Sequence, residues 1–326
     1  MPQLQFREAI REALVEEMRN DDSIVIMGEE VAEYDGAYKV TQGMYEEFGG
    51  KRVIDTPISE LGFAGIGVGA AMNGLRPIIE FMTFNFAVVG MDQIINNAAK
   101  LRYMSGGQVK IPIVFRGPNG AAGQLGATHS VSYESLYAHY PGLKVMYPSE
   151  PGDAKGMLKT AIRDDDPVIF LESEQMYGLK GEVPEGEHII PLGKGKIKRE
   201  GSDVTIVAHG KIYHVAKKAA EELAKDGIEA EIIDPRTIKP FDMEMVIESV
   251  KKTNRLVIVD ESHPFCGIAS EVGFQIQRDA FDYLDAPILR VCLPDAPAPF
   301  AKNLYDYWFP DAKQIIDAVK TVTYSK

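Results

Sequence analysis

The sequence predicts an α/β protein of two domains, each built on a parallel sheet covered by helices. Short apolar runs alternate with longer segments in which apolar residues recur at helical spacing, a rhythm typical of parallel sheets flanked by helices. One stretch rich in glycine, proline and charge interrupts this rhythm at residues 176–200. We therefore expect a first domain at 1–175, a linker at 176–200 and a second domain at 201–326.

The elements follow one another in a regular order. In the first half, buried strands are expected at residues 23–27, 77–81, 111–115, 144–147 and 168–171. Helical spacing marks the segments 7–19, 65–73, 92–103 and 154–163. In the second half, strands are expected at 203–210, 228–234 and 255–262, with helices at 213–226, 242–252 and 268–282. Right-handed crossovers would join four or five strands of this half into one sheet.

The composition is that of an ordinary globular protein and argues against several function classes. The 326 residues are 45% hydrophobic and 25% charged, which is enough apolar material for two cores. Lys and Arg total 35 against 48 Asp and Glu, giving a net charge of -13, so nucleic acid is not an expected partner. The sequence contains no run of 18 uncharged apolar residues, so no membrane span is predicted. Two cysteines without metal-ligand spacing, and an N-terminal segment unlike a signal peptide, favour a cytoplasmic protein.

The most informative motif is the segment 55–74, DTPISELGFAGIGVGAAMNG, which holds the carboxylate of Glu60. The apolar and glycine-rich residues after it offer little to solvate a charge, so burial would raise the pKa of Glu60 and make its proton shareable with a cofactor nitrogen. Gly65, Gly67 and Ala70 also match the dinucleotide fingerprint G-x-G-x-x-A. They follow a polar turn and not a buried strand, so close helix packing is the better interpretation of these glycines.

Two further segments offer candidate site residues. His129 stands on the glycine-rich stretch 116–130, which follows a predicted strand at the edge where open α/β sheets bind ligands. A lone loop histidine is more often structural than a proton-transfer group, and both interpretations stay open from the residues alone. Met82 and Phe86 follow another strand; such clusters usually belong to a core, yet a flat heteroaromatic ligand needs walls of this kind.

Taken together, these motifs resemble a known family. The segment 55–100, RGPNG at 116–120, YPSEPGDAKGMLKTAIRDDDPVIFLE, DPRTIKPFD and LRVCLPDAPAPFAK occur in order along essentially the whole chain. They resemble the beta subunit of the first, decarboxylating component of 2-oxoacid dehydrogenase complexes, with the pyruvate type nearest. The resemblance implies a transketolase-like pyrimidine-binding domain followed by a transketolase C-terminal domain.

The resemblance also implies thiamine diphosphate, shared with an alpha subunit that holds the diphosphate and Mg²⁺. Glu60 would contact the pyrimidine N1′ nitrogen and stabilise the imino tautomer that removes the thiazolium proton. Met82 and Phe86 would pack on the aminopyrimidine, and His129 would serve the transfer of the acyl group to lipoamide. The family's potassium site, built mainly from main-chain carbonyls, would map onto Ile113, Ala161, Ile162, Asp164 and Asp166. Close relatives often carry Asn at the position of Asp166, so only a main-chain contact is expected there, and a solvated turn remains the alternative interpretation.

Partners and alternatives complete the prediction. The resemblance implies an α2β2 heterotetramer that docks on the lipoyl-bearing dihydrolipoamide acyltransferase core and acts on pyruvate. An acidic surface could steer a basic partner domain. Within the same chemistry, the alternatives are a branched-chain 2-oxoacid or acetoin dehydrogenase. From other classes, a noncatalytic assembly subunit would make Glu60 dispensable, and a nicotinamide oxidoreductase would need a true fingerprint.

Overall fold

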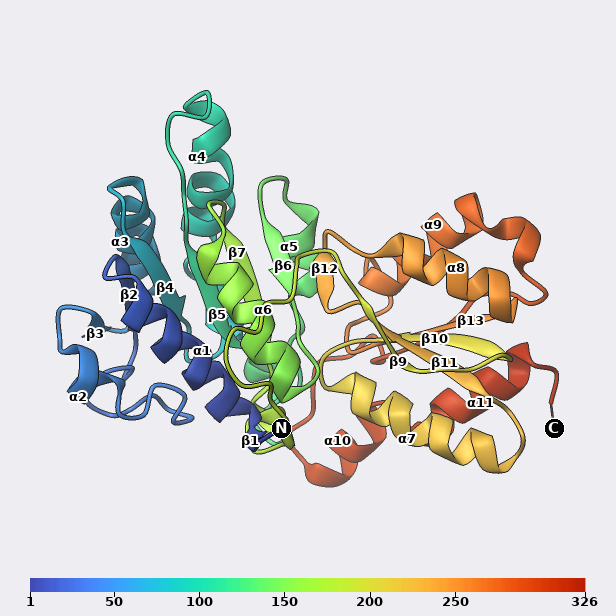
Figure 1. The fold of residues 1–326 in the computed structure, drawn as a ribbon. Coiled ribbons are helices and arrows are strands. Elements are labelled where there is room, and N and C mark those ends of the chain that lie inside the picture. The colour runs from blue at the N-terminus through green and yellow to red at the C-terminus, as the bar shows by residue number, and fades with distance from the viewer. Residues whose placement is uncertain (326) are drawn as a thin grey trace. The chain divides into compact units, whose positions relative to one another are not determined.

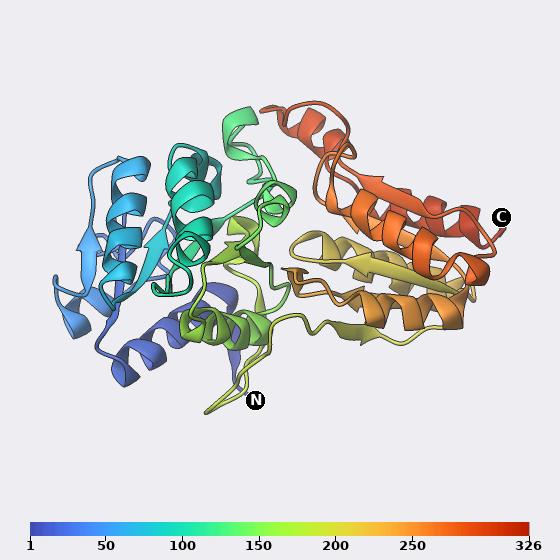
Figure 2. The ribbon, with the colours of Figure 1, turned by 90° about the horizontal axis from the view of Figure 1, so that it is seen from above.

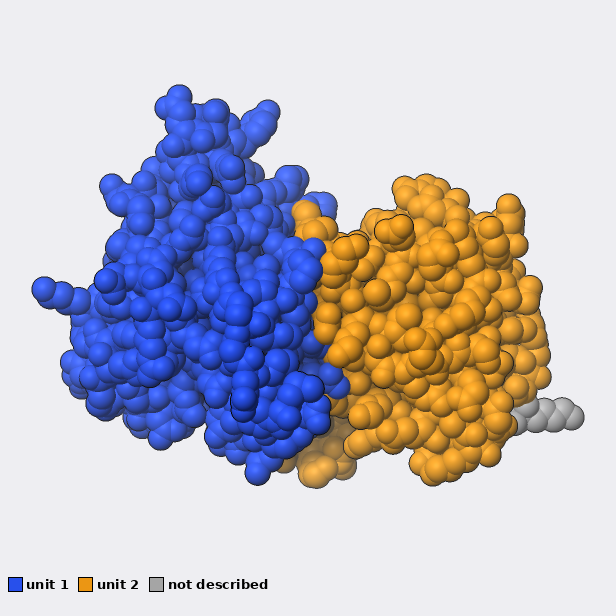
Figure 3. All heavy atoms as spheres, in the orientation of Figure 1, with its two compact units in different colours: residues 1–119, 136–192 blue, residues 120–135, 193–326 orange. Residues whose placement is uncertain are grey.

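A computed structural model describes residues 1–325, and the chain divides into two compact units (Figure 3). Unit 1 comprises Met1–Asn119 and Leu136–Leu192, and unit 2 comprises Gly120–Ser135 and the chain from Gly193 onward. The segment 176–200, expected as a linker, contains a strand of each unit: β8 (Lys180–Glu182) in unit 1 and β9 (Lys196–Arg199) in unit 2. The chain therefore enters unit 2 twice.

Unit 1 is built on a parallel sheet in the strand order β6-β7-β5-β4-β2-β3 (Figures 1 and 2). These strands are β2 (Ile24–Gly28), β3 (Val53–Asp55), β4 (Arg76–Glu80), β5 (Val114–Pro118), β6 (Lys144–Met146) and β7 (Val168–Glu172). Each of the five strands expected in the first half is present, and β3 is an additional short edge strand. A separate antiparallel pair joins β1 (Gln3–Gln5) to β8.

The helices of unit 1 bury their apolar faces, as the sequence spacing predicts. The α-helices are α1 (Phe6–Asn20), α2 (Met44–Phe48), α3 (Glu60–Met72), α4 (Ala99–Met104) and α6 (Pro151–Arg163), while α5 (Glu134–His139) begins in unit 2. Shorter turns are η1 (Phe84–Val88), η2 (Gln93–Ala98), η3 (Ala127–His129) and η4 (Glu174–Met176). The helix expected at 92–103 is divided, because η2 is a π-helical turn that precedes α4.

Helix α3 lies close to strand β4 because glycine faces the sheet. A Cβ atom on Gly67 would lie 2.5 Å from Cδ1 of Ile79, so no larger residue fits at this point without a shift. Gly65, Gly67 and Ala70 all lie inside this helix and not at a strand-to-helix turn. The structure therefore supports helix packing over the dinucleotide fingerprint.

Unit 2 is a second α/β layer structure, with the strand order β14-β13-β10-β11-β9. Only β9 runs antiparallel to its neighbour. Besides β9, the strands of this sheet are β10 (Val204–Ala208), β11 (Ala230–Asp234), β13 (Leu256–Asp260) and β14 (Leu289–Cys292). The short strand β12 (Thr237–Lys239) lies outside this sheet. The helices are α7 (Ile212–Lys225), α8 (Met243–Thr253), α9 (Ile268–Asp279), η5 (Phe281–Tyr283), α10 (Lys302–Trp308) and α11 (Ala312–Val322).

Two large apolar cores lie in unit 2, one on each face of its sheet, beside a smaller cluster of Ala121, Leu293, Ala298 and Trp308. The first joins buried residues of the sheet to α7 and α11, and the second joins it to α8 and α9. This arrangement confirms the predicted α/β class. Within residues 1–325, no helix combines the length and the apolar character required to cross a bilayer.

Candidate active site

Glu60 is the first residue of α3, and only 8% of its surface is exposed. It follows the N-cap Ser59, at the point where the first N–H groups of a helix lack partners within the helix. The partial positive charge of a helix N-terminus favours a carboxylate at this position. Local sequence thus places a buried acid at a point where its ionised form has electrostatic support.

A second buried carboxylate, Glu29, interacts electrostatically with Glu60. Glu29 directly follows β2 and is 9% exposed, and its Oε1 atom is buried without a hydrogen-bond partner. Burial, and after it the negative charge of Glu60, raises the pKa of the Glu29 carboxyl above its ordinary value. The two acids therefore form an electrostatically coupled pair at the carboxyl edge of the sheet.

Met82 and Phe86 lie beyond the end of the neighbouring strand, β4, and both side chains are half-buried. The residues between and beside them differ: Phe81 and Phe84 are fully buried, with ring centroids 5.5 Å apart. The alternation leaves Met82 and Phe86 half-buried, while Phe81 and Phe84 anchor the segment in the core. Thr83 begins η1, where its side chain accepts a hydrogen bond from the Asn85 N–H.

A close backbone contact joins this segment to Glu60. Gly90 follows η1, and a Cβ atom at this position would lie 2.9 Å from the main-chain oxygen of Glu60. The chain therefore passes directly against the start of α3. Met82 and Phe86 lie on the same segment of unit 1, between the end of β4 and Gly90.

A buried ion cluster fixes the strand ends beneath these residues. The Arg116 guanidinium donates two hydrogen bonds of 2.6 Å to Glu172 and also pairs with Glu80. Tyr177 adds a hydroxyl hydrogen bond of 2.8 Å to Glu172. Burial raises the pKa of the Glu80 carboxyl although the charge of Arg116 opposes this shift. Because Glu80, Arg116 and Glu172 come from β4, β5 and β7, the cluster ties three strands together where the chain leaves the sheet.

His129 belongs to unit 2, in the segment Gly120–Ser135. It ends the short turn η3 and is half-buried, with Nδ1 3.0 Å from the hydroxyl of Thr128. The following residue, Ser130, is buried. The structure therefore places His129 on a loop, as expected, and in a different unit from Glu60.

The five residues of the predicted potassium site come from the end of α6 and its neighbours. Ala161 and Ile162 lie in the last turn of α6, where helix carbonyls lack partners within the helix and carry partial negative charge. The Arg76 Nη1 atom donates to the carbonyls of both Ile162 and Asp164, each at 3.0 Å. These two carbonyls therefore point toward one cationic group, and each oxygen keeps a second lone pair.

The carboxylates of this segment are already paired. Asp164 accepts hydrogen bonds of 2.6 and 2.7 Å from Lys144, and Asp166 pairs with Arg102 and Lys144. The Ile113 carbonyl accepts a hydrogen bond of 3.0 Å from the Val168 N–H. The basic side chains thus balance the charge of both carboxylates.

The sequence analysis did not select Glu29 or the Arg116 cluster. Glu29 could have been found, because it follows the predicted strand 23–27 at the edge where ligands bind in open α/β sheets. Arg116 and its partners could not, because the glutamates lie 36 and 56 residues away along the chain. Their proximity depends on the order of strands in the sheet.

Comparisons with known domains agree with this architecture. A model of the transketolase pyrimidine binding domain matches residues 2–180, and a model of the transketolase C-terminal domain matches residues 193–315. The fold is similar to that of a solved "split gene transketolase, inactive beta4 tetramer", with a TM-score of 0.81, 23% identity and 99% of each chain covered. At this identity the likeness concerns the fold alone.

Several curated proteins are similar over nearly the full chain. The "pyruvate dehydrogenase E1 component subunit beta" of Rickettsia felis is 58% identical, with 99% of both chains covered. The subunit of the same name from Rhizobium meliloti is 56% identical over 99% of this chain and 71% of the relative. The mitochondrial counterpart from Dictyostelium discoideum is 52% identical over 97% of this chain and 90% of the relative. With its two transketolase-type domains, the chain belongs to the family of pyruvate dehydrogenase E1 component beta subunits.

Proposed function

We propose that this chain is the beta subunit of a thiamine diphosphate-dependent pyruvate dehydrogenase that oxidatively decarboxylates pyruvate and acetylates lipoyl groups. The observation that carries the proposal is the buried carboxylate of Glu60 at the start of α3, in a chain more than half identical to named E1 beta subunits. The sequence contains no P-loop or diphosphate motif of its own. An alpha subunit that holds the diphosphate and Mg²⁺ therefore completes the site.

The residues around Glu60 fit the aminopyrimidine ring of this cofactor. Bound thiamine diphosphate supplies the electron sink that makes loss of CO₂ from a 2-oxoacid possible. Glu60 would share a hydrogen bond and a proton with a ring nitrogen of the bound cofactor, and its buried setting would keep water from competing for that hydrogen bond. The partly exposed Met82 and Phe86 offer a soft and a flat apolar surface to the ring.

His129 is proposed to move a proton during transfer of the acetyl group to lipoamide. Its half-buried position lets the imidazole contact both protein groups and a substrate. The lipoyl-bearing acyltransferase core is the expected acceptor, and the net charge of -13 would favour a basic docking domain.

A potassium ion is proposed at the end of α6, bound by the main-chain carbonyls of Ile113, Ala161, Ile162, Asp164 and Asp166. The support is that carbonyls of Ile162 and Asp164 converge on one cationic donor while the nearby carboxylates are paired with basic side chains. The cytoplasm is the proposed compartment, because Cys266 and Cys292 are both free thiols.

Co-expression with an alpha partner, followed by a substrate panel, tests the proposal. We expect an α2β2 assembly that decarboxylates pyruvate faster than branched-chain 2-oxoacids or acetoin, with little thiamine diphosphate binding by the separate chain in calorimetry. A preference for another substrate in the panel would reassign the enzyme within the same chemistry. Full activity of Glu60→Gln in the assembly would instead favour a noncatalytic assembly subunit.

A further inference from the structure

The loop that carries His129 is fixed to unit 2 at both of its ends. Near its start, the Ala121 N–H donates a hydrogen bond of 2.6 Å to Glu261, and the Ala121 carbonyl accepts one of 2.6 Å from Lys211. Lys211 and Glu261 also pair directly at 3.0 Å. Near its end, the Ser132 hydroxyl donates to the main-chain oxygen of Glu261. These contacts lie within the unit formed by Gly120–Ser135 and the chain from Gly193 onward.

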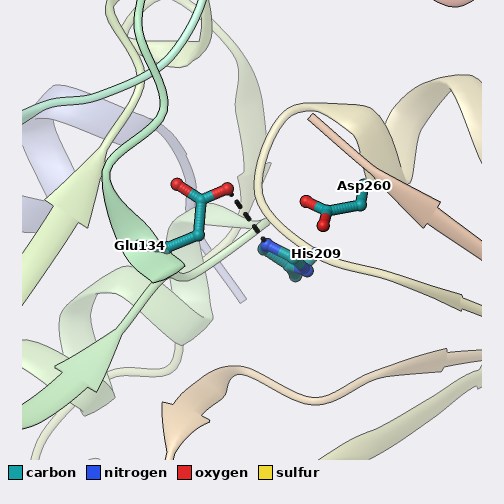
Figure 4. Close-up of side chains that lie close together, drawn as sticks. All are labelled: Glu134, His209 and Asp260. Carbon is teal, nitrogen blue, oxygen red and sulfur yellow. Dashed lines mark ion pairs between the residues drawn. The ribbon is translucent and has the colours of Figure 1, made fainter. Parts of the chain in front are cut away.

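A cluster of three buried titratable side chains lies at the end of this loop. Glu134, His209 and Asp260 expose 0%, 3% and 0% of their surface. Figure 4 shows the carboxylates of Glu134 and Asp260 on either side of the His209 imidazole. His209 Nε2 lies 3.9 Å from Glu134 Oε1, which is an ion-pair distance and too long for a hydrogen bond. One side-chain nitrogen of His209 and one carboxylate oxygen each of Glu134 and Asp260 all lie within 4.8 Å of one another.

The sheet of unit 2 determines the positions of His209 and Asp260. Asp260 ends β13 and His209 directly follows β10, and these two strands are parallel neighbours. Asp260 Oδ2 accepts hydrogen bonds of 2.7 Å from the Ser262 hydroxyl and 3.2 Å from the Ala269 N–H at the start of α9. Its other oxygen, Oδ1, is buried without a hydrogen-bond partner. Asp260 and His209 are thus rigid strand-end groups, whereas Glu134 arrives from the loop.

The charges around the imidazole favour its protonated form. Burial lowers the pKa of His209, but Glu134, Asp260 and Asp234 together outweigh burial and raise it above the ordinary value. Burial and the charge of Glu134 likewise raise the pKa of Asp260. The other facing groups, Lys211 and Glu261, neutralise each other as a pair. An imidazolium therefore balances two carboxylates that would otherwise repel each other.

We propose that His209, as an imidazolium between Glu134 and Asp260, is a positioning residue that fixes the loop 120–135 and thereby the place of His129. The inference rests on the proposed role of His129 in acyl transfer. Its physical basis is separate, because buried like charges left without a cation are costly. Loss of the imidazolium would release the end of the loop, and His129 would lose its fixed position.

Hydrogen exchange followed by mass spectrometry tests this clamp in the assembled protein. For His209→Gln we expect at least about tenfold faster exchange in the peptide covering residues 120–135, because Gln cannot carry the charge. Combining it with Glu134→Gln should restore much of the protection, since the repulsion between Glu134 and Asp260 is then removed. If both residues acted through packing alone, the losses of exchange protection caused by His209→Gln and Glu134→Gln would add in the double variant. The exposed His139→Gln serves as the matched control and should leave this peptide unchanged.

The pH dependence provides a readout that packing alone would not change. Because folding raises the pKa of His209, its charge is present while the two carboxylates are ionised and is lost as pH rises through the raised value; at acidic pH the carboxylates protonate and no longer repel each other. Protection of residues 120–135, corrected for intrinsic exchange rates, should fall in the wild type as pH rises through the raised pKa of His209 and stay constant over the same range in His209→Gln. Equal pH profiles in the two proteins would overturn the clamp.

Measurements of enzyme activity and of bound metal distinguish the clamp from the remaining explanations. We expect His209→Gln to slow lipoamide acetylation more than decarboxylation with an artificial electron acceptor. Faster loop exchange with unchanged acetylation would support the clamp and count against the proposed role of His129. A stoichiometric metal ion in the wild type, measured by mass spectrometry and lost in His209→Gln, would overturn the imidazolium clamp in favour of a bound cation.

Discussion

The negative charge of Glu60 contributes to the raised pKa of Glu29, although the two residues lie on different elements of unit 1. Glu29 follows β2, and Glu60 begins α3, so the pair forms where a strand end meets a helix start. A charge pair of this kind is unfavourable for stability, and such arrangements concentrate at functional sites. The relationship therefore supports the proposal that this edge of the sheet carries the active site.

Glu29→Gln is expected to stabilise the chain at neutral pH. The pKa of Glu29 is raised in the folded state, so its stabilising contribution is complete at acidic pH and is lost as pH rises through the raised value. Gln does not ionise, so the variant does not lose this stability as pH rises. Thermal unfolding at acidic and neutral pH should show a higher midpoint for the variant only at neutral pH. The exposed Glu33→Gln is the control, and a midpoint shift that is the same at both pH values would contradict the account.

Phe86→Ala should weaken cofactor binding more than it slows catalysis. A lost aromatic contact of about 1.4 kcal/mol would raise the thiamine diphosphate concentration needed for half-maximal activity about tenfold in the assembled enzyme. The partly exposed Val88→Ala, on the same short helix, should have no such effect. Unchanged cofactor dependence in Phe86→Ala would remove this residue from the binding surface.

His129→Ala should separate the two half-reactions. Loss of a proton-transfer group slows the step that needs it by roughly 10²–10⁴-fold, so lipoamide acetylation should fall far more than decarboxylation with an artificial electron acceptor. Parallel assays of one preparation measure both. An equal loss in the two assays would contradict the assignment of His129 to acyl transfer.

Potassium should stabilise the fold through main-chain oxygens. A ligand that binds only the native state adds about 2.7 kcal/mol when present at about 100 times its Kd. Replacing potassium with a large organic cation should therefore lower the unfolding midpoint. Asp166→Asn should keep the potassium response, because the carbonyl remains and the carboxylate only pairs with Arg102 and Lys144. A midpoint that is insensitive to potassium in both proteins would contradict the site.

Features of the fold that depend on neighbouring residues could be predicted from the sequence, whereas features that depend on distant residues could not. Strand β2 is a continuous apolar run, and β7 is one up to its last residue, Glu172, so both buried strands could be found by composition alone. The start of α3 was expected five residues too late, because glycine-rich spacing hides the helix that begins at Glu60. The short edge strand β3 offered no comparable apolar run.

The site was predictable only in part, for a similar reason. Glu60, Met82 and Phe86 could be selected because each lies in a distinctive local segment, and the family resemblance gave them roles. The grouping of 120–135 with unit 2 could not be foreseen, because it depends on contacts such as Ala121 with Glu261, 140 residues apart. The pairing of His209 with Asp260 likewise requires the order of strands in unit 2.

The rate of pyruvate decarboxylation by Glu60→Gln, assembled with an alpha partner, tests the central claim most directly. Because Gln keeps the size of the side chain but cannot transfer the proton, we expect a loss of about 10²–10⁴-fold with assembly and partial cofactor binding retained. Glu46→Gln, an exposed carboxylate on α2, is the matched control and should remain fully active. A Glu60→Gln enzyme within about twofold of the wild-type rate would contradict the assignment of Glu60 to the cofactor.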